Sequence, residues 1–235
     1  MANPKVYIHE LVDIIGQNRA KYMHHMTANW APLAAERGMG CLGVWATVGS
    51  TGRWPQTVNV WELDGWGHMA ANFRRELSHP THQDPALARW WAEAAQYRSG
   101  GLDRVLVPAP YSPTVAEALA QGRGGQVYYH ELVSVAPGRA RAFLDQVGQE
   151  WLAVAGDLGM VLVGAWRTAM VNDSEAVLIW SLADWDAWGR AQAALDAPDP
   201  QVARWRQRTE GLALDWRGTL MVPAPLCPLN TGRPL

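Results

Sequence analysis

The chain contains the same sequence twice, and this duplication constrains its fold more than any other feature. The opening Val6-Tyr7-Ile8-His9-Glu10-Leu11-Val12 returns 121 residues later as Val127-Tyr128-Tyr129-His130-Glu131-Leu132-Val133. The match runs without a gap from 6–47 to 127–168, and 13 of these 42 positions are identical. A repeat of this length is typical of a duplicated domain and is too long for the unit of a solenoid.

The repeat also sets the expected domain boundaries. The match resumes after short deletions and ends where Val-Pro-Ala-Pro occurs in both copies. We therefore expect one unit at 6–110 and a second at 127–225. The segment 111–126 contains one proline and three glycines and is expected to be a linker.

Each unit is expected to follow the order strand, helix, strand, strand, helix, strand. β-Branched and aromatic runs predict strands, and apolar residues at helical spacing predict helices. In the first unit the expected strands are 6–12, 42–48, 57–63 and 105–107, and the expected helices are 16–36 and 66–77. This order is that of the α+β ferredoxin-like fold, whose sheet has helices on one face and needs cover on the other. Two such units in one chain satisfy that need by packing sheet against sheet.

Several stretches of each unit resemble the dimeric α/β-barrel superfamily, and most of all NIPSNAP-type proteins. In the first unit the resemblance rests on Val6-Tyr7-Ile8-His9-Glu10-Leu11, Glu36-Arg37-Gly38, Leu42-Gly43-Val44-Trp45 and Val58-Asn59-Val60-Trp61-Glu62. It implies two tandem ferredoxin-like units that form an intramolecular barrel, as two subunits do elsewhere in the superfamily. The superfamily includes cofactor-free oxygenases, polyketide cyclases, lactone isomerases, dehalogenating lyases and haem-binding enzymes, so the fold does not select one activity.

Composition excludes several classes of protein. The net charge of −2 argues against a nucleic-acid-binding protein, and no apolar run is long enough to span a membrane. The two cysteines, Cys41 and Cys227, are too few and too far apart to indicate a disulfide scaffold or a cysteine metal site. We therefore expect a cytoplasmic protein.

Polar residues that occur in both repeats are expected to hold the architecture. His9 and His130 form one such pair, and Glu10 and Glu131 form another. On a strand, His9 and Glu10 point to opposite faces. A buried histidine needs a hydrogen-bond partner, and a bond between the two repeats would supply it.

Polar residues that occur only in the first repeat are the better candidates for catalysis. Helical spacing places Tyr22, His25 and Asn29 beside one another at the edge of an apolar face. A phenol, an imidazole and an amide at one cavity would make a general acid–base set, and we predict these three as catalytic residues. The alternative is that His25 is half buried and only forms a structural hydrogen bond.

The expected substrate pocket is largely aromatic, because the chain has 14 tryptophans. Most of the predicted substrate-binding residues have an apolar or amide side chain expected near the helix 16–36, and one is a carboxylate of the second repeat. They are Asn59, Trp61, Trp45, Trp66, Phe73 and Glu150. Such a lining predicts a hydrophobic small molecule as partner. We expect no metal and no cofactor.

Three functions remain open at this stage. The first is a cofactor-independent lyase, isomerase or oxygenase that works by general acid–base chemistry in the first-repeat pocket. The second is a haem or metal protein with His25 or His9 as ligand. The third is a ligand-binding protein without catalytic activity. The two repeats are expected to form a pseudo-dimer within one chain, and further homo-oligomerisation stays open.

Overall fold

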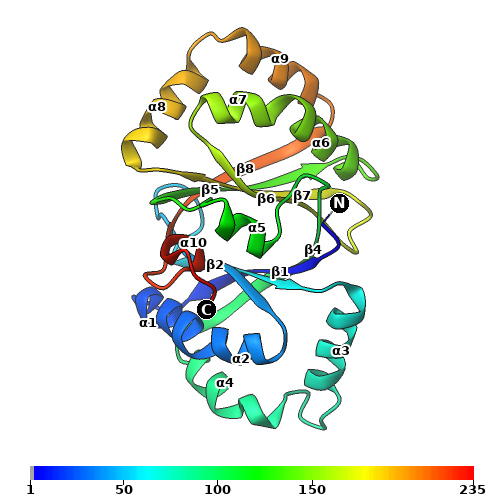
Figure 1. Ribbon diagram of the computed structural model, residues 1–235, viewed down its shortest axis with the longest axis vertical. Coiled ribbons are helices and arrows are strands. Elements are labelled where there is room, and N and C mark those ends of the chain that lie inside the picture. Colours follow the sequence, from blue (N-terminus) through cyan, green and yellow to red (C-terminus); the bar gives the residue numbers. More distant parts are fainter. Residues whose placement is uncertain (1–2) are drawn as a thin grey trace.

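The computed structural model describes residues 3–235 and shows two stacked halves, with helices on the outside and the two sheets facing each other (Figure 1). The first half has four strands: β1 (Val6–Ile14), β2 (Gly40–Thr47), β3 (Gln56–Leu63) and β4 (Arg98–Pro108). Its helices are α1 (Arg19–His24), a π-helical segment (His25–Trp30), α2 (Ala31–Glu36), α3 (Trp66–Leu77), a 3₁₀ turn (Pro85–Leu87) and α4 (Ala88–Ala94).

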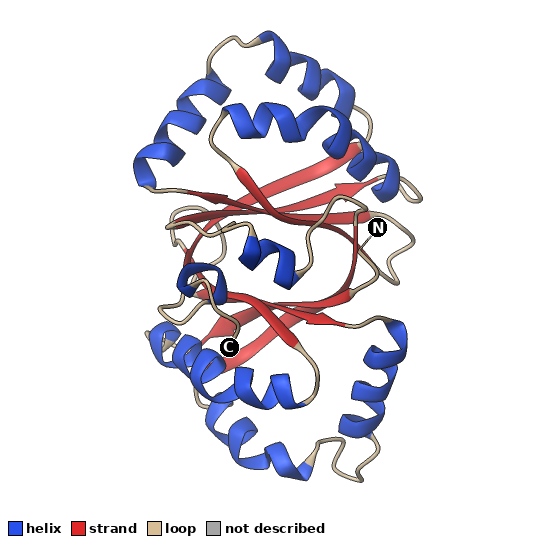
Figure 2. Ribbon diagram, in the orientation of Figure 1, coloured by secondary structure: helices blue, strands red, loops and turns tan. Residues whose placement is uncertain are grey.

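The second half repeats this order. Its strands are β5 (Val127–Val135), β6 (Val161–Thr168), β7 (Glu175–Leu182) and β8 (Ala213–Pro223). Its helices are α6 (Ala140–Gln146), a π-helical segment (Val147–Trp151), α7 (Leu152–Asp157), α8 (Trp185–Asp196) and α9 (Pro200–Thr209). Two short helices, α5 (Val115–Ala120) and α10 (Pro228–Thr231), lie across the space between the two sheets in the view of Figure 2. None of the helices within residues 3–235 is both long and apolar enough to cross a bilayer.

The strands close into one antiparallel barrel. Within the first half, β1 lies between β3 and β4, and β2 pairs with the other edge of β3. The second half has the same pairing, and two seams, β2–β8 and β4–β6, join the sheets. The predicted intramolecular barrel of two ferredoxin-like units is therefore confirmed. The last strand of the first repeat is longer than the expected 105–107, since β4 extends from Arg98 to Pro108.

The barrel interior is filled by the sheet faces that the helices leave uncovered. Strand alternation turns His9 and Trp45 inward and Glu10 outward, toward the helices. The Nε2 atoms of His9 and His130 lie 2.9 Å apart and their ring planes differ by 16°. With ring centroids 5.0 Å apart, the two imidazoles meet head to head through one N–H···N bond. The expected hydrogen bond between the repeats is thus confirmed.

A glycine is required beside each inward-facing tryptophan of β2 and β6. A Cβ atom built on Gly43 would lie 2.2 Å from the ring of Trp45, and one on Gly164 would lie 2.0 Å from the ring of Trp166. Both indoles are fully buried and lie flat over the glycine of their own strand. Close packing inside the barrel therefore explains why Gly-x-Trp occurs in both repeats.

The first long helix of each repeat is widened at the same place. Residues His25–Trp30 and Val147–Trp151 form π-helical turns, with more residues per turn than the α-helix. Side chains that follow such a turn are rotated away from the positions that α-helical spacing predicts. This local geometry affects the residues that the sequence pattern marked as catalytic.

Candidate functional site

A carboxylate lies at the base of a cavity between the first sheet and its helices. Glu10, on the outer face of β1, accepts hydrogen bonds at Oε2 from Trp61 Nε1 (2.7 Å) and Asn59 Nδ2 (3.0 Å). The Asn59 amide also donates to the Tyr22 hydroxyl oxygen at 3.2 Å. Within residues 3–235, Glu10 Oε1 has no hydrogen-bond partner, and Glu10 lines the cavity. One oxygen therefore anchors the carboxylate and the other is left for a ligand.

The cavity around Glu10 is mainly aromatic and has a volume of about 370 Å³. Its walls come from elements far apart in the sequence. They include Trp30, Trp61, Phe73, Trp90 and Trp91 from the first repeat and Met170 from the hairpin between β6 and β7 of the second. The site is thus assembled by both repeats, and its lining suits an apolar or aromatic molecule.

Burial raises the pKa of Glu10 above its ordinary value, and the negative charge of Asp103 on β4 raises it further. The hydrogen bonds from Trp61 and Asn59 act in the opposite direction, because they stabilise the charged form. A carboxylate with a raised pKa in a cavity is a stronger base than one in water and is typical of functional sites.

The second repeat has a corresponding cavity with a carboxylate held differently. Glu131 accepts a bond from Trp180 Nε1 at Oε2 (2.6 Å) and from Trp216 Nε1 at Oε1 (2.8 Å), so both of its oxygens are occupied. Burial raises the pKa of Glu131 to about 7. The cavity is larger, about 830 Å³, and Trp151, Trp205 and Arg206 contribute to its lining.

Glu10 and Glu131 were assigned an architectural role from the sequence because both repeats have them, and that interpretation missed the two cavities. The signal for them was present in the strand alternation. It places a carboxylate of each repeat on the helix-covered face, where an apolar side chain is expected.

The structure does not bring the three predicted catalytic residues to one cavity. His25 is 2% exposed; its Nε2 lies 3.2 Å from the Trp90 carbonyl oxygen and its Nδ1 lies 3.0 Å from Asn29 Nδ2. Donation from Nε2 to the carbonyl and from the amide to Nδ1 uses both ring nitrogens. The imidazole also stacks on the Trp90 indole, with centroids 5.0 Å apart. These contacts tie the first helix to α4, and the catalytic role of His25 stays a prediction that this geometry does not favour.

Asn29 is placed differently from the expectation, whereas Tyr22 lies on the buried face of the helix, where the helical spacing put it. Asn29 is exposed, whereas Tyr22 is fully buried beneath the helix, and burial raises the pKa of its hydroxyl well above the usual value. Asn29 lies within the π-helical turn between His25 and Trp30, whereas the prediction assumed regular α-helical spacing.

The predicted substrate-binding residues divide into three groups. Trp61 and Phe73 line the first-repeat cavity, and Asn59 lies beneath it, bound to Glu10. Trp45 is inside the barrel, 5.3 Å from the ring of Tyr128, and therefore faces away from the cavity. Trp66 is 52% exposed at the start of α3.

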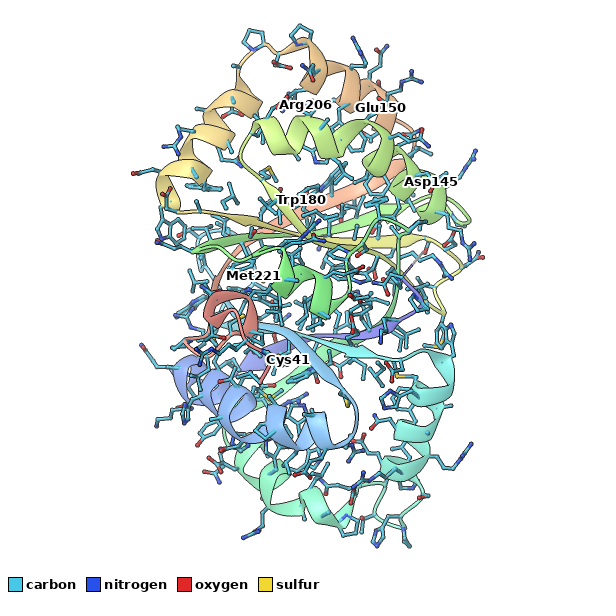
Figure 3. The ribbon with its side chains drawn as sticks, in the orientation of Figure 1. Cys41, Asp145, Glu150, Trp180, Arg206 and Met221 are labelled. Atoms are coloured by element: carbon cyan, nitrogen blue, oxygen red, sulfur yellow. The ribbon has the colours of Figure 1, made fainter. Side chains whose placement is uncertain are left out.

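Glu150, the remaining predicted substrate-binding residue, is a surface carboxylate. It lies in the outer helical layer of the second repeat, with Trp180 at the sheet below (Figure 3). Its Oε1 is 3.6 Å from Arg208 Nε, and both side chains are partly exposed. The carboxylate at the base of the second cavity is Glu131 instead.

The histidines proposed as haem or metal ligands do not fit that role. His25 has both ring nitrogens occupied, and His9 Nε2 is bound to His130 inside the barrel. Neither histidine is among the side chains that line the first-repeat cavity. No group of three or more His, Cys, Asp or Glu suited to a metal ion occurs in the described part of the chain.

Comparison with known proteins identifies the fold. No protein-family model matches the sequence, and no curated protein matches it either. Among solved structures, an anthrone oxidase-like protein matches 95% of this chain and 93% of its own, with 13% identity and a TM-score of 0.65. A candidate monooxygenase from Lactobacillus acidophilus matches 94% of both chains, with 14% identity and a TM-score of 0.60.

NIPSNAP-domain proteins are also among the similar structures. One from Burkholderia xenovorans matches 43% of this chain and 98% of its own, with 21% identity and a TM-score of 0.39. The two structures that match almost the whole chain show that it has a dimeric α/β-barrel fold, formed here by two halves of one polypeptide, as the sequence resemblance implied.

Proposed function

We propose that the chain is a small-molecule enzyme, a cofactor-free oxygenase, in which Glu10 is the general base toward a hydrophobic aromatic substrate. The observation that carries this proposal is the arrangement of the Glu10 carboxylate. One oxygen is fixed by Trp61 and Asn59, and the other has no partner in an aromatic cavity. A fixed base with a raised pKa beside an apolar binding surface meets the geometric and electrostatic requirements of proton abstraction.

The proposed reaction begins with an acidic methylene group next to a carbonyl or an aromatic ring. Glu10 Oε1 takes one proton, and the aromatic walls hold the ring system of the resulting carbanion and keep water away. The carbanion adds to O₂ and a carbon–oxygen bond forms, and the resulting peroxide anion takes the proton back from Glu10. Loss of the second C–H proton then breaks the O–O bond and releases hydroxide, which combines with that proton to give water. The methylene becomes a carbonyl, and one O₂ is consumed for each carbonyl and each water formed.

The names of two structural neighbours, an anthrone oxidase-like protein and a candidate monooxygenase, support an oxygenase over a lyase or an isomerase. A lyase or isomerase would use the same base without consuming O₂. A protein that only binds its ligand would have no need of a basic carboxylate, because an apolar cavity alone suffices for binding.

Oxygen uptake tests the proposal. With anthrone as the first probe, followed by related aromatic ketones with an acidic methylene, we expect uptake that the Glu10→Gln substitution lowers roughly 10²–10⁴-fold. Glu36→Gln changes an exposed carboxylate at the end of α2 and is the matched control, expected to have no effect. Uptake that is equal in the wild type and the Glu10→Gln variant would refute Glu10 as the base. Conversion that depends on Glu10 without oxygen uptake would favour a lyase or isomerase.

A further inference from the structure

The first-repeat cavity has carboxylates at two positions where the second repeat has none, whereas the second cavity has Glu210 and Asp215 at other positions of its lining. Besides Glu10, the cavity is lined by Glu76 of α3 and Asp103 of β4. Helices α3 and α8 both have 12 residues and begin at matching tryptophans, so Leu195 takes the place of Glu76. Asp103 pairs with Glu10 across the strands, and Gly218 pairs with Glu131 in the same way. The duplication thus provides an internal comparison of two cavities on the same scaffold.

The three carboxylates of the first cavity are not neutralised by ion pairs. Within residues 3–235, none of Glu10, Glu76 and Asp103 has a basic nitrogen within 4.0 Å. Arg104 lies next to Asp103, but its guanidinium binds Glu175 at 2.7 and 3.1 Å. The positive charge of Arg98 reaches Glu10 and Asp103, that of Arg104 also reaches Asp103, and that of Arg37 reaches Glu76, without an ion pair to any of the three carboxylates. Within residues 3–235 the three carboxylates therefore have no directly bound cationic side chain.

Aromatic rings line the same cavity as these carboxylates. Trp30 lies 4.7 Å from Trp90 and 6.2 Å from Trp61 between ring centroids, and Trp91 lies 4.8 Å from Trp90. The faces of indole rings attract cations, and the attraction increases when water is excluded. In the second repeat the position of Trp91 is occupied by Arg206, which lines that cavity and would repel a cation. Aromatic faces and carboxylates together recognise a ligand that is both hydrophobic and positively charged.

We propose that the first-repeat cavity selects an aromatic compound that carries a protonated amine, and that Glu76, Asp103 and the tryptophan faces hold the ammonium group. In the second-repeat cavity, Leu195 and Gly218 stand in place of these two carboxylates, and Arg206 adds a positive charge. Asp215 of that cavity is paired with Arg217 at 2.7 Å, which leaves less negative charge there to hold an ammonium group. The inference deepens the proposed function, since it rests on the same cavity as the site of reaction and names its substrate class. Glu10 keeps its free oxygen for the proton of the substrate.

The pKa values of the carboxylates agree with this assignment. Burial raises the pKa of both Glu10 and Glu76 in the unliganded protein. A bound cation stabilises the charged form of a carboxylate and lowers its pKa. Binding of the amine is therefore expected to lower the pKa of both carboxyls back toward their ordinary value.

Equilibrium calorimetry without oxygen tests the proposal, with 2-naphthylmethylamine and its neutral analogue 2-naphthalenemethanol as probes. We expect the wild type to bind the amine about tenfold more tightly than the alcohol, from cation–π attraction and the carboxylates together. The Glu76→Gln/Asp103→Asn variant should lose most of this preference while its affinity for the alcohol stays unchanged. Glu210→Gln, which changes a carboxylate at the second-repeat cavity, is the matched control and should retain it.

The outcomes separate this inference from the proposed function. Equal affinity for amine and alcohol, or a preference that survives in the double variant, would overturn the inference. A preference lost equally in the Glu210→Gln variant would also overturn it, because the effect would then be nonspecific charge. Because these measurements need no turnover, an amine preference that holds while Glu10→Gln leaves oxygen uptake intact would refute only the role of Glu10 as base.

Discussion

Replacement of His25 by alanine is expected to destabilise the fold, with no substrate needed to observe the effect. The side chain is 2% exposed, and its loss leaves the Trp90 carbonyl without its hydrogen-bond donor. An unsatisfied buried group of this kind costs about 1–3 kcal/mol. The space left beside the Trp90 indole adds a packing loss, since buried large-to-small substitutions cost about 2–5 kcal/mol in all. We therefore expect a loss of about 3 kcal/mol in the free energy of unfolding.

Thermal and urea unfolding measure this loss. For a chain of this length 1 kcal/mol corresponds to about 2–4 °C, so the Tm of the His25→Ala variant should fall by about 6–12 °C. His24→Ala is the control, because His24 is the adjacent residue in the sequence but is exposed. Its effect should stay within about 0.5 kcal/mol. Equal stability of the two variants would refute the view that His25 joins the first helix to α4.

Two further predictions concern the second cavity and the barrel interior. The pKa of Glu131 is about 7 in the folded protein against an ordinary value of 4.5, so the folded state holds this proton more tightly. The contribution of Glu131 to the free energy of unfolding is full below about pH 4.5 and falls by about 3 kcal/mol as the pH rises through 7. This fall should disappear in the Glu131→Gln variant. A free energy of unfolding, measured in urea, that does not change over this pH range in the wild type would count against a buried carboxyl at this position. Gly43→Ala should lower the Tm strongly, because its Cβ would overlap the Trp45 ring, whereas Gly67→Ala, with no atom within 4 Å of the new Cβ, should leave the Tm unchanged or raise it. Similar Tm values for these two glycine variants would contradict the close approach of Gly43 and Trp45.

Comparison of the two repeats predicted some residues at the first-repeat cavity and others that lie elsewhere. Residues unique to the first repeat were taken as functional, and this reasoning selected Asn59, which is bound to Glu10 beneath the cavity, but also His25, which does not line it. Residues shared by the repeats were taken as structural, which is the role of the His9–His130 pair. The same reasoning passed over Glu10, which we propose as the base, and Glu131, because a duplication copies a carboxylate whatever its role. Glu76 and Asp103 differ between the repeats and were missed as well, since neither stands out in its own helix or strand.

The periodicity of apolar residues was sufficient to predict individual strands and helices from the sequence alone. Apolar alternation defined β1 and set His9 and Glu10 on opposite faces, and helical spacing placed α3 at its observed bounds. The duplication, with a sheet face that had to be covered, required the two halves to close on each other.

Only the tertiary structure decided which side chains meet in the cavity. Glu10, Trp90 and Met170 come from β1, α4 and a hairpin of the other repeat, and they are adjacent only after the barrel has closed. The π-helical turn at His25–Trp30 changes the helix phase without a visible mark in the residue pattern. The physical reason is the same for both: sequence periodicity describes one element at a time, whereas a cavity depends on packing between elements distant in the chain.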